Sequence, residues 1–242
     1  MTDSILNTGS ELSTNGFAIF NDIFSNLEVE SLIKMIEEAD RTKPTFRKSN
    51  GLFAIRQFLK EVPQTKEILF NHNLRTCINA LCGNEYFVVK SIYFDKPGNS
   101  NWFVAYHQDL TIAVDKKVEV EGFSHWTVKH AQYAVQPPDY ILEDNFTIRI
   151  HLDETNQDNG ALKVVAGSHL KGVQRRETAD WRGESETFCA VQKGGIMIMK
   201  PLLLHASHKT TNNNKRRVIH IEFSSSPLPL DLEWAEKEKI YW

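Results

Sequence analysis

Residues 146–165 read FTIRIHLDETNQDNGALKVV, two runs rich in β-branched residues with a polar turn between them. The first run, 146–152, places its side chains alternately on two faces, as a strand does. The second run, 161–165, is shorter and also apolar. Asn159-Gly160 between the two runs is a strong signal for a β-hairpin. The stretch therefore predicts two antiparallel strands joined by a turn at residues 156–160.

Similar runs lie on either side of this stretch. Strands are predicted at residues 86–94 (YFVVKSIYF), 195–199 (GIMIM) and 218–223 (VIHIEF). Turn clusters rich in Gly, Asn, Asp and Pro separate them. Strands that follow one another without intervening helices favour an antiparallel sandwich or barrel over a parallel α/β sheet.

The N-terminal third has a different pattern. Residues 16–20 (GFAIF) predict a short strand, and Ser25 with Glu28 forms a capping-box signature for a helix that runs to about Ala39. Apolar residues at helical spacing predict a second helix before Gly83, with Asn73 as its N-cap. The expected fold is an all-β core with flanking helices.

Residues 115–144 show no clear periodicity and contain Pro137-Pro138. We expect an irregular insertion of the kind that often covers a site. The whole chain, 1–242, is interpreted as one domain, with a helix-rich part over 1–85, a β core over about 86–225 and a tail over 226–242.

Composition excludes several classes of protein. The 242 residues are 41% hydrophobic and 24% charged, with a formal net charge of -3. No basic stripe indicates nucleic-acid binding, and no apolar run approaches the length of a membrane span. Met1–Asn15 lacks the features of a signal peptide. Three cysteines without C-x-x-C spacing indicate reduced core residues, so we expect a cytoplasmic protein. We also expect its partner to be a small molecule.

Three residues have the composition of a metal site. His107 and Asp109 are separated by one residue, so on an extended strand both side chains point to the same side. His205 follows the predicted strand at 195–199 and supplies a second imidazole. Two histidines and one carboxylate form the facial triad of non-haem Fe(II) oxygenases, which leaves positions open for co-substrate and dioxygen.

Arg216 and Arg217 follow His205 and open the strand at 218–223. A guanidinium binds a carboxylate through paired hydrogen bonds. Alternation distinguishes the two candidates. Arg217 shares a face with apolar residues, whereas Arg216 shares one with His220, and the more polar face better suits a cofactor pocket. We therefore predict Arg216 as the anion anchor, with Arg217 as the alternative.

With these residues in place, the chain resembles the phytanoyl-CoA dioxygenase family of Fe(II)/2-oxoglutarate-dependent oxygenases over about Tyr93 to Phe223. The resemblance rests on an ordered set of motifs: His107-Gln108-Asp109, DNGAL at 158–162, Gly167-Ser168-His169, PLLLHAS at 201–207, and Arg216-Arg217. It implies a double-stranded β-helix, that is, a jelly roll of the cupin type. It also implies Fe(II) on His107, Asp109 and His205, 2-oxoglutarate on Arg216 with help from Ser207, and O2 as oxidant.

Two further features follow from the resemblance. Related halogenases have Gly or Ala in place of Asp109, so the carboxylate argues for hydroxylation or another oxidation, such as desaturation or cyclisation, over halogenation. Arg149 falls where relatives place a residue that lines the co-substrate pocket. Arg149 is predicted to bind a carboxylate of 2-oxoglutarate or of an acidic substrate, unless Thr147, Arg149 and His151 simply face water.

The expected activity is hydroxylation of an unactivated C–H bond in a small metabolite or amino acid, with release of succinate and CO2. Arg56 and Trp126 are candidate substrate contacts, and a carboxylate-bearing substrate is favoured if Arg149 or Arg56 is free to bind it. The sequence leaves two alternatives, a non-catalytic cupin-like binding module and a zinc hydrolase with the same ligands. It says nothing about oligomeric state.

Overall fold

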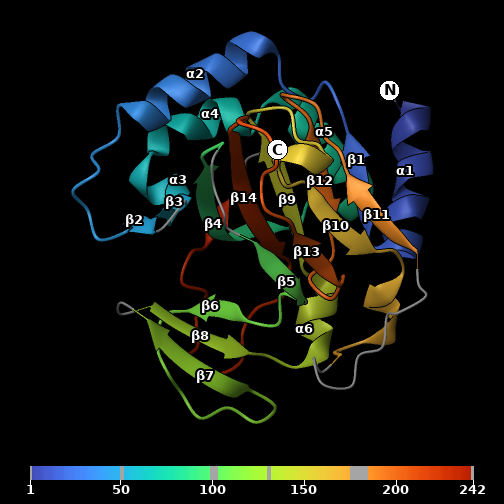
Figure 1. The fold of residues 1–242 in the computed structure, drawn as a ribbon. Coiled ribbons are helices and arrows are strands. Elements are labelled where there is room, and N and C mark those ends of the chain that lie inside the picture. Colours follow the sequence, from blue (N-terminus) through green and yellow to red (C-terminus); the bar gives the residue numbers. More distant parts are fainter. Residues whose placement is uncertain (1, 50–51, 99–102, 130–131, 175–184, 241–242) are drawn as a thin grey trace.

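The structure, a computed structural model, describes residues 2–49, 52–98, 103–129, 132–174 and 185–240. Its largest element is an eight-stranded antiparallel sheet, here called the major sheet (Figure 1). In spatial order its strands are β1 (Phe17–Phe20), β12 (Ile196–Met199), β9 (Phe146–His151), β14 (Arg216–Ser224), β4 (Phe87–Lys96), β3 (Leu52–Arg56) and β2 (Phe46–Ser49), with β15 (Glu238–Lys239) also paired to β4.

A second, four-stranded sheet packs on one face of the major sheet. This minor sheet has the order β11 (Glu186–Cys189), β10 (Leu162–Val165), β13 (His205–Ser207) and β5 (Val104–His107). Met197 and Met199 of the major sheet form a buried apolar cluster with Leu162 and Val164 of the minor sheet. Two antiparallel sheets packed face to face form the predicted jelly roll.

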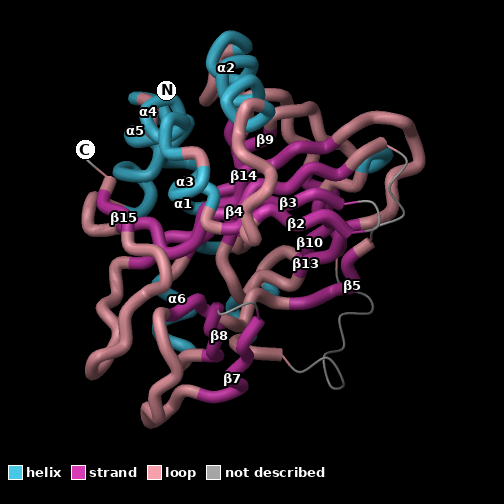
Figure 2. Tube along the Cα trace, turned by 90° about the vertical axis from the view of Figure 1, so that its left-hand side faces the viewer, coloured by secondary structure: helices cyan, strands magenta, loops and turns pink. Residues whose placement is uncertain are grey.

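Helices cover the other face of the major sheet, as Figure 2 shows for α1, α3, α4 and α5. Ile148, Ile150, Ile219 and Ile221 point toward the helices and are completely buried. The helices are α1 (Thr2–Asn15), α2 (Asn26–Glu37), α3 (Phe58–Glu61), α4 (Lys66–Leu69), α5 (His72–Cys82) and α6 (Asp139–Asp144). The main apolar core therefore lies between the helices and the sheet, on the side away from the minor sheet.

The caps of two helices can be compared with the sequence prediction. The capping box of α2 is present, with the Ser25 hydroxyl accepting from the Glu28 amide and the Glu28 carboxylate accepting from the Ser25 amide. For α5 the N-cap prediction was wrong. Asn71 caps the helix, and the side chain of Asn73 instead donates to the Ile23 carbonyl.

The hairpin predicted at Asn159-Gly160 was also wrong. β9 belongs to the major sheet and β10 to the minor sheet, so the strands on either side of the turn do not pair. Residues Gln157–Asn159 form a 3-10 turn, and Gly160 takes a left-handed conformation with φ of 84°. The turn chemistry was read correctly, but the turn carries the chain from one sheet to the other.

The insertion is more regular than expected. β6 (Ile112–Val114), β8 (Gln132–Gln136) and β7 (Ser124–Lys129) form a three-stranded antiparallel sheet, here called the small sheet, and α6 follows it. Figure 1 shows this sheet set apart from the two larger ones. The prediction of an irregular segment over 115–144 was wrong for β7 and β8, because these strands are short and mix polar with apolar residues, so their sequence carries little periodic signal.

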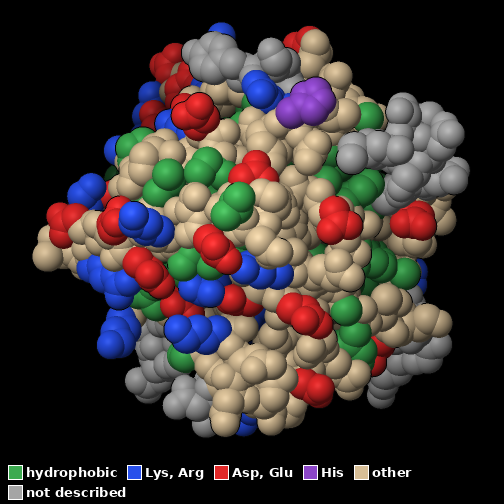
Figure 3. Space-filling view, turned by 90° about the horizontal axis from the view of Figure 1, so that it is seen from above, with side chains coloured by type: hydrophobic (Ala, Val, Ile, Leu, Met, Phe, Trp, Pro, Cys, Tyr) green, Lys and Arg blue, Asp and Glu red, His purple; other side chains and the backbone are tan. Residues whose placement is uncertain are grey.

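The charged surface is mixed. Figure 3 shows one face of the molecule, on which basic and acidic side chains are interspersed and do not gather into areas of one sign. Among the helices of the described residues, none has the length and apolar character needed to cross a bilayer.

Candidate metal centre and anion pocket

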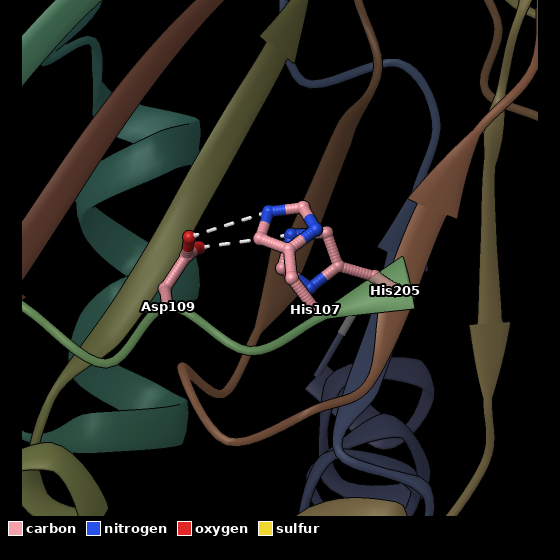
Figure 4. A group of neighbouring side chains, drawn as sticks. All are labelled: His107, Asp109 and His205. Atoms are coloured by element: carbon pink, nitrogen blue, oxygen red, sulfur yellow. Dashed lines mark ion pairs between the residues drawn. The ribbon is translucent and has the colours of Figure 1, made fainter. Parts of the chain in front are cut away.

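The side chains of His107, Asp109 and His205 converge at one point (Figure 4). Each offers one ligand atom, and these atoms lie within 4.8 Å of one another. The Nε2 atoms of His107 and His205 each lie 3.8 Å from a different carboxylate oxygen of Asp109. No other group of three or more His, Cys, Asp or Glu side chains within the described ranges has this geometry.

Strand pairing brings the two histidines together. His107 ends β5, His205 begins β13, and the two residues are direct partners in the antiparallel pairing. Directly opposed residues have neighbouring side chains, and the two ring centroids are 4.2 Å apart. Asp109 lies beyond the end of β5, so the prediction that the strand continues through it was wrong. Its amide donates to the Pro201 carbonyl at 2.9 Å, which holds the loop beside His205.

Each imidazole is oriented by a backbone carbonyl. Nδ1 of His107 lies 2.9 Å from the Ala105 carbonyl oxygen, and Nδ1 of His205 lies 2.8 Å from that of Leu203. A carbonyl only accepts, so Nδ1 carries the proton in both rings and the Nε2 lone pairs face Asp109. Hydrogen bonding of the other ring nitrogen is the usual arrangement around a metal-binding histidine.

Electrostatics favour the ligating forms. Burial alone raises the pKa of Asp109, but its electrostatic interactions with the neighbouring His205, His220 and Lys90 side chains outweigh burial and lower the pKa of Asp109 to about 2. Burial lowers the pKa of His205 to about 4. At neutral pH the site therefore contains an ionised carboxylate and a neutral imidazole, and both have lone pairs for a cation.

Gln108, between the two ligand candidates, points away from them. Its amide nitrogen donates to the carbonyls of Leu202 and Gly172 at 2.7 and 2.9 Å, and its oxygen accepts from the Gln174 amide at 2.7 Å. This side chain ties the His107–Asp109 loop to the segment after β10 and to the segment before β13. The sequence predicted that Gln108 faces away but did not predict this role.

The two arginines at the start of β14 have different environments. Arg217 is held by Asp153, with Nε to Oδ2 at 2.9 Å and Nη2 to Oδ1 at 2.7 Å. Arg216 lies on the opposite face, between the sheets, and is 8% exposed. Its Nη1 donates to the Gly160 carbonyl, while its buried Nε has no hydrogen-bond partner. Of these two arginines, only Arg216 therefore has unused hydrogen-bonding capacity directed into the interior.

Two more residues accompany Arg216. Ser207 is buried and lies two residues after His205 on β13, so both side chains lie on the inward side of that strand. Lys96 is the direct cross-strand partner of Arg216 and is 1% exposed. Its Nζ donates to the His208 carbonyl at 2.7 Å, and burial lowers its pKa to about 8. Sequence reasoning did not identify this second buried cation.

Arg149 is also inside the molecule. Thr147, Arg149 and His151 are at most 9% exposed, which rules out the alternative that this face of β9 meets water. Arg149 Nη1 lies 3.2 Å from Nδ1 of His220, and its buried Nε has no partner. Burial lowers the pKa of Arg149 to about 10.

A chain of polar contacts continues from Arg149 across the major sheet. His220 Nε2 lies 3.0 Å from Glu222 Oε1, and Lys90 Nζ lies 2.7 Å from the same oxygen. Sequence reasoning missed Lys90 and Glu222, because on separate strands they resemble ordinary surface charges. Alternation along β14 was the available signal, since Arg216, His220 and Glu222 share one face.

The predicted substrate contacts lie near the small sheet. Arg56 is half-buried at the end of β3, and its Nη1 donates to the Gln132 side-chain oxygen of β8 at 3.1 Å. Trp126 packs against a separate apolar cluster that includes Ile112, Val135 and Trp234. The structure therefore gives Trp126 a packing role, and its contact with substrate stays a prediction.

The chain was compared with known proteins. The sequence model of the phytanoyl-CoA dioxygenase family matches residues 12–218. No curated protein matches. Solved structures of similar fold include the non-haem α-ketoglutarate-dependent carbocyclase SnoK of nogalamycin biosynthesis, at 14% identity and a TM-score of 0.68, covering 90% of this chain and 83% of that one.

Two further structures of similar fold contain ligands. EctD from S. alaskensis, with 2-oxoglutarate and 5-hydroxyectoine, has 18% identity and a TM-score of 0.68, covering 90% of this chain and 75% of that one. HygX from Streptomyces hygroscopicus, with nickel, 2-oxoglutarate and hygromycin B, has 15% identity and a TM-score of 0.63, covering 90% and 86%. At these identities the likeness shows the fold.

Proposed function

The chain belongs to the phytanoyl-CoA dioxygenase family of Fe(II)/2-oxoglutarate-dependent oxygenases, and from this premise we propose that it hydroxylates an unactivated C–H bond of a small molecule. The observation that carries the proposal is the convergence of His107, Asp109 and His205 with both Nε2 atoms turned toward the carboxylate. Two imidazoles and one carboxylate on one side of a cation fit a site that keeps the other positions open.

The residues present fit both cofactors. His107, Asp109 and His205 hold the iron. Arg216 binds the distal carboxylate of 2-oxoglutarate, with Ser207 beside it, because a buried guanidinium with a free Nε–H requires an anionic partner. When bound, iron and 2-oxoglutarate together with O2 supply the oxidant for C–H cleavage and release succinate and CO2.

The protein's own residues orient the three metal ligands. The carbonyls of Ala105 and Leu203 fix the two imidazoles, and Gln108 fixes the loop that carries Asp109. The carboxylate of Asp109 occupies the position that halogenases leave free, which supports hydroxylation as the outcome. Family membership favours this reading over a non-catalytic binding module or a hydrolase.

The substrate is a small molecule, and we propose that it carries a carboxylate. Proteins of similar fold have been solved with 5-hydroxyectoine and with hygromycin B, both small polar compounds. Arg56 lies where the major sheet meets the small sheet, and among the described residues its side chain is hydrogen-bonded to the neutral amide of Gln132 and to no carboxylate. An acidic metabolite or amino acid would supply a carboxylate partner.

We interpret residues 1–242 as one catalytic domain. The described cysteines, Cys77, Cys82 and Cys189, are all free thiols. Free, mostly buried thiols fit the reducing environment of a cytoplasm.

A screen of metabolites for succinate formation tests the proposal. Wild-type protein with Fe(II), 2-oxoglutarate and O2 should form succinate in step with a product whose mass has increased by one oxygen. Asp109→Ala measures background turnover. Coupled succinate formation that is as fast in Asp109→Ala as in the wild type would contradict the assignment. Arg56→Ala should then raise the substrate KM, and an unchanged KM would remove the support for an acidic substrate at Arg56.

A further inference from the structure

Four charged or polar side chains form a continuous row on the inward face of the major sheet. Arg149 contacts His220, His220 contacts Glu222, and Glu222 contacts Lys90, over distances of 3.2, 3.0 and 2.7 Å. The register explains the row, because His220 is directly opposite Arg149 on β9 and Glu222 is directly opposite Lys90 on β4. Such a row is costly to bury, so it needs a function or a full set of partners.

The row orients one group that has no full set of partners. Glu222 accepts from His220 Nε2–H, so Nδ1 of His220 is the acceptor for Arg149 Nη1–H. His220 therefore holds one edge of the guanidinium. The Nε–H of Arg149 is buried and has no partner. Glu222 and Lys90 are satisfied by each other, so Arg149 is the member of the row that remains able to bind an anion.

Arg149 lies between the metal centre and Arg216. Asp109 and Glu222 line the same small cavity, so the Glu222 end of the row lies next to the metal centre. Along β14, the partner of Arg149 is His220, and Arg216 is four residues earlier on the same face. A molecule that reaches from the metal centre to Arg216 has to pass Arg149.

We propose that Arg149 binds the carboxylate of 2-oxoglutarate at the metal end, next to the keto group, and that His220, Glu222 and Lys90 position it there. The inference rests on the proposed function and deepens it. 2-Oxoglutarate has two carboxylates, and the pocket presents separate cations for them, with Arg216 at one end and Arg149 at the other. Arg56 remains for the substrate, which resolves the choice that the sequence left open for Arg149.

Truncating the ligand separates the two ends. 2-Oxobutyrate has the same keto acid as 2-oxoglutarate but lacks the distal carboxylate. Binding of both compounds to Ni(II)-loaded protein, without substrate, is measured by titration calorimetry for wild type, Arg149→Met and Arg216→Met. Arg149→Met should weaken the binding of both compounds by roughly 10- to 100-fold, because a charge-assisted hydrogen bond to the protein is lost in each case. Arg216→Met should weaken 2-oxoglutarate and leave 2-oxobutyrate nearly unchanged.

Two variants test the positioning row. Arg149→Lys retains the charge and should recover part of the lost affinity for both compounds. Glu222→Gln removes the charge that orients His220 and should weaken both compounds by a smaller factor than Arg149→Met. A purely structural role for Arg149 predicts no recovery of affinity by Lys. Ni(II) affinity without co-substrate and the thermal midpoint control for misfolding.

Two results would overturn the inference. Unchanged binding of both compounds in Arg149→Met would assign Arg149 to the substrate. Loss of 2-oxoglutarate affinity alone, with 2-oxobutyrate unaffected, would place Arg149 at the distal carboxylate. If wild-type protein with Ni(II) bound neither compound, the proposed function itself would fail, and that failure is distinguishable because it does not depend on any variant.

Discussion

Arg216 and Arg217 are adjacent in sequence, identical in chemistry and opposite in environment, so exchanging each for Met gives a matched test of the anion pocket. Met approximates the length of the arginine stem without its charge. Arg217 forms two side-chain hydrogen bonds to Asp153, whereas Arg216 is buried with an unpartnered Nε. Arg217→Met should therefore remove a stabilising ion pair, whereas Arg216→Met should remove a buried charge.

The expected stability changes have opposite signs. Burial lowers the pKa of Arg216 to about 9, which corresponds to a cost of roughly 5 kcal/mol for keeping it charged at neutral pH. The hydrogen bond to the Gly160 carbonyl offsets part of this cost. Arg216→Met should therefore leave the free energy of unfolding unchanged or raise it by up to about 3 kcal/mol. Arg217→Met should lower it by roughly 1 to 3 kcal/mol, since Asp153 loses its partner.

The pH dependence checks the cause. A cation whose folded-state pKa is lowered costs stability below that pKa, and the cost falls as pH rises through it, because the unfolded chain then holds more protons. The advantage of Arg216→Met over wild type should therefore shrink between about pH 9 and pH 10. Urea unfolding of the metal-free protein at several pH values measures this difference.

For co-substrate affinity, Arg216→Met should be the damaging substitution and Arg217→Met the mild one, the reverse of their effects on stability. Arg216→Met should weaken binding of 2-oxoglutarate to the Ni(II)-loaded protein by about 30- to 900-fold, from the roughly 2 to 4 kcal/mol lost when one member of a buried charge pair is truncated. Arg217→Met should change this affinity less than about threefold. Equal effects of the two variants on affinity, or a large loss of stability in Arg216→Met alone, would refute the reasoning.

Three further predictions follow from the described geometry. Asp109→Ala should reduce Ni(II) affinity by more than about 100-fold in calorimetry, because a direct ligand matters more than the outer contacts that cost 10- to 100-fold; metal affinity within tenfold of wild type would contradict the proposed site. Gly194→Ala should destabilise more than Gly83→Ala in urea unfolding, because both have positive φ but only at Gly194 would a Cβ lie 2.3 Å from a backbone oxygen, that of Phe24; equal losses would show that this contact relaxes. Ser25→Ala should cost about 1 kcal/mol through loss of the α2 capping box, and a loss below about 0.3 kcal/mol would mean that the cap is satisfied in another way.

The sequence predicted most of the jelly roll because its central strands are apolar on one face and bounded by turns. Residues 146–152 and 218–223 correspond to β9 and β14, which pair with each other at the centre of the major sheet. The preference for Arg216 over Arg217 came from the family resemblance together with alternation, and the structure places the two side chains on opposite faces as alternation requires.

Other features depend on tertiary contacts that local patterns do not encode. Asn159-Gly160 signals a turn, but whether the flanking strands pair is decided by the two sheets they join. The small sheet shares an apolar cluster with α6 and with the segment around Trp234, and that last segment is distant from β7 in sequence. Lys90 and Glu222 are paired only because β4 and β14 are neighbours in register.

The two faces of the major sheet divide stability from function. The helix-facing side contains the completely buried Ile148, Ile150, Ile219 and Ile221, and it supplies the apolar burial that stabilises the fold. The opposite side buries Lys96, Arg149 and Arg216, each of which lowers stability while it lacks an anion. A dicarboxylate that binds there removes this cost only in the folded state, so 2-oxoglutarate should raise the thermal midpoint of the metal-loaded protein in a concentration-dependent manner. Arg216→Met should abolish most of this shift while Arg217→Met retains it, and a shift that survives in Arg216→Met would separate ligand binding from the buried cation.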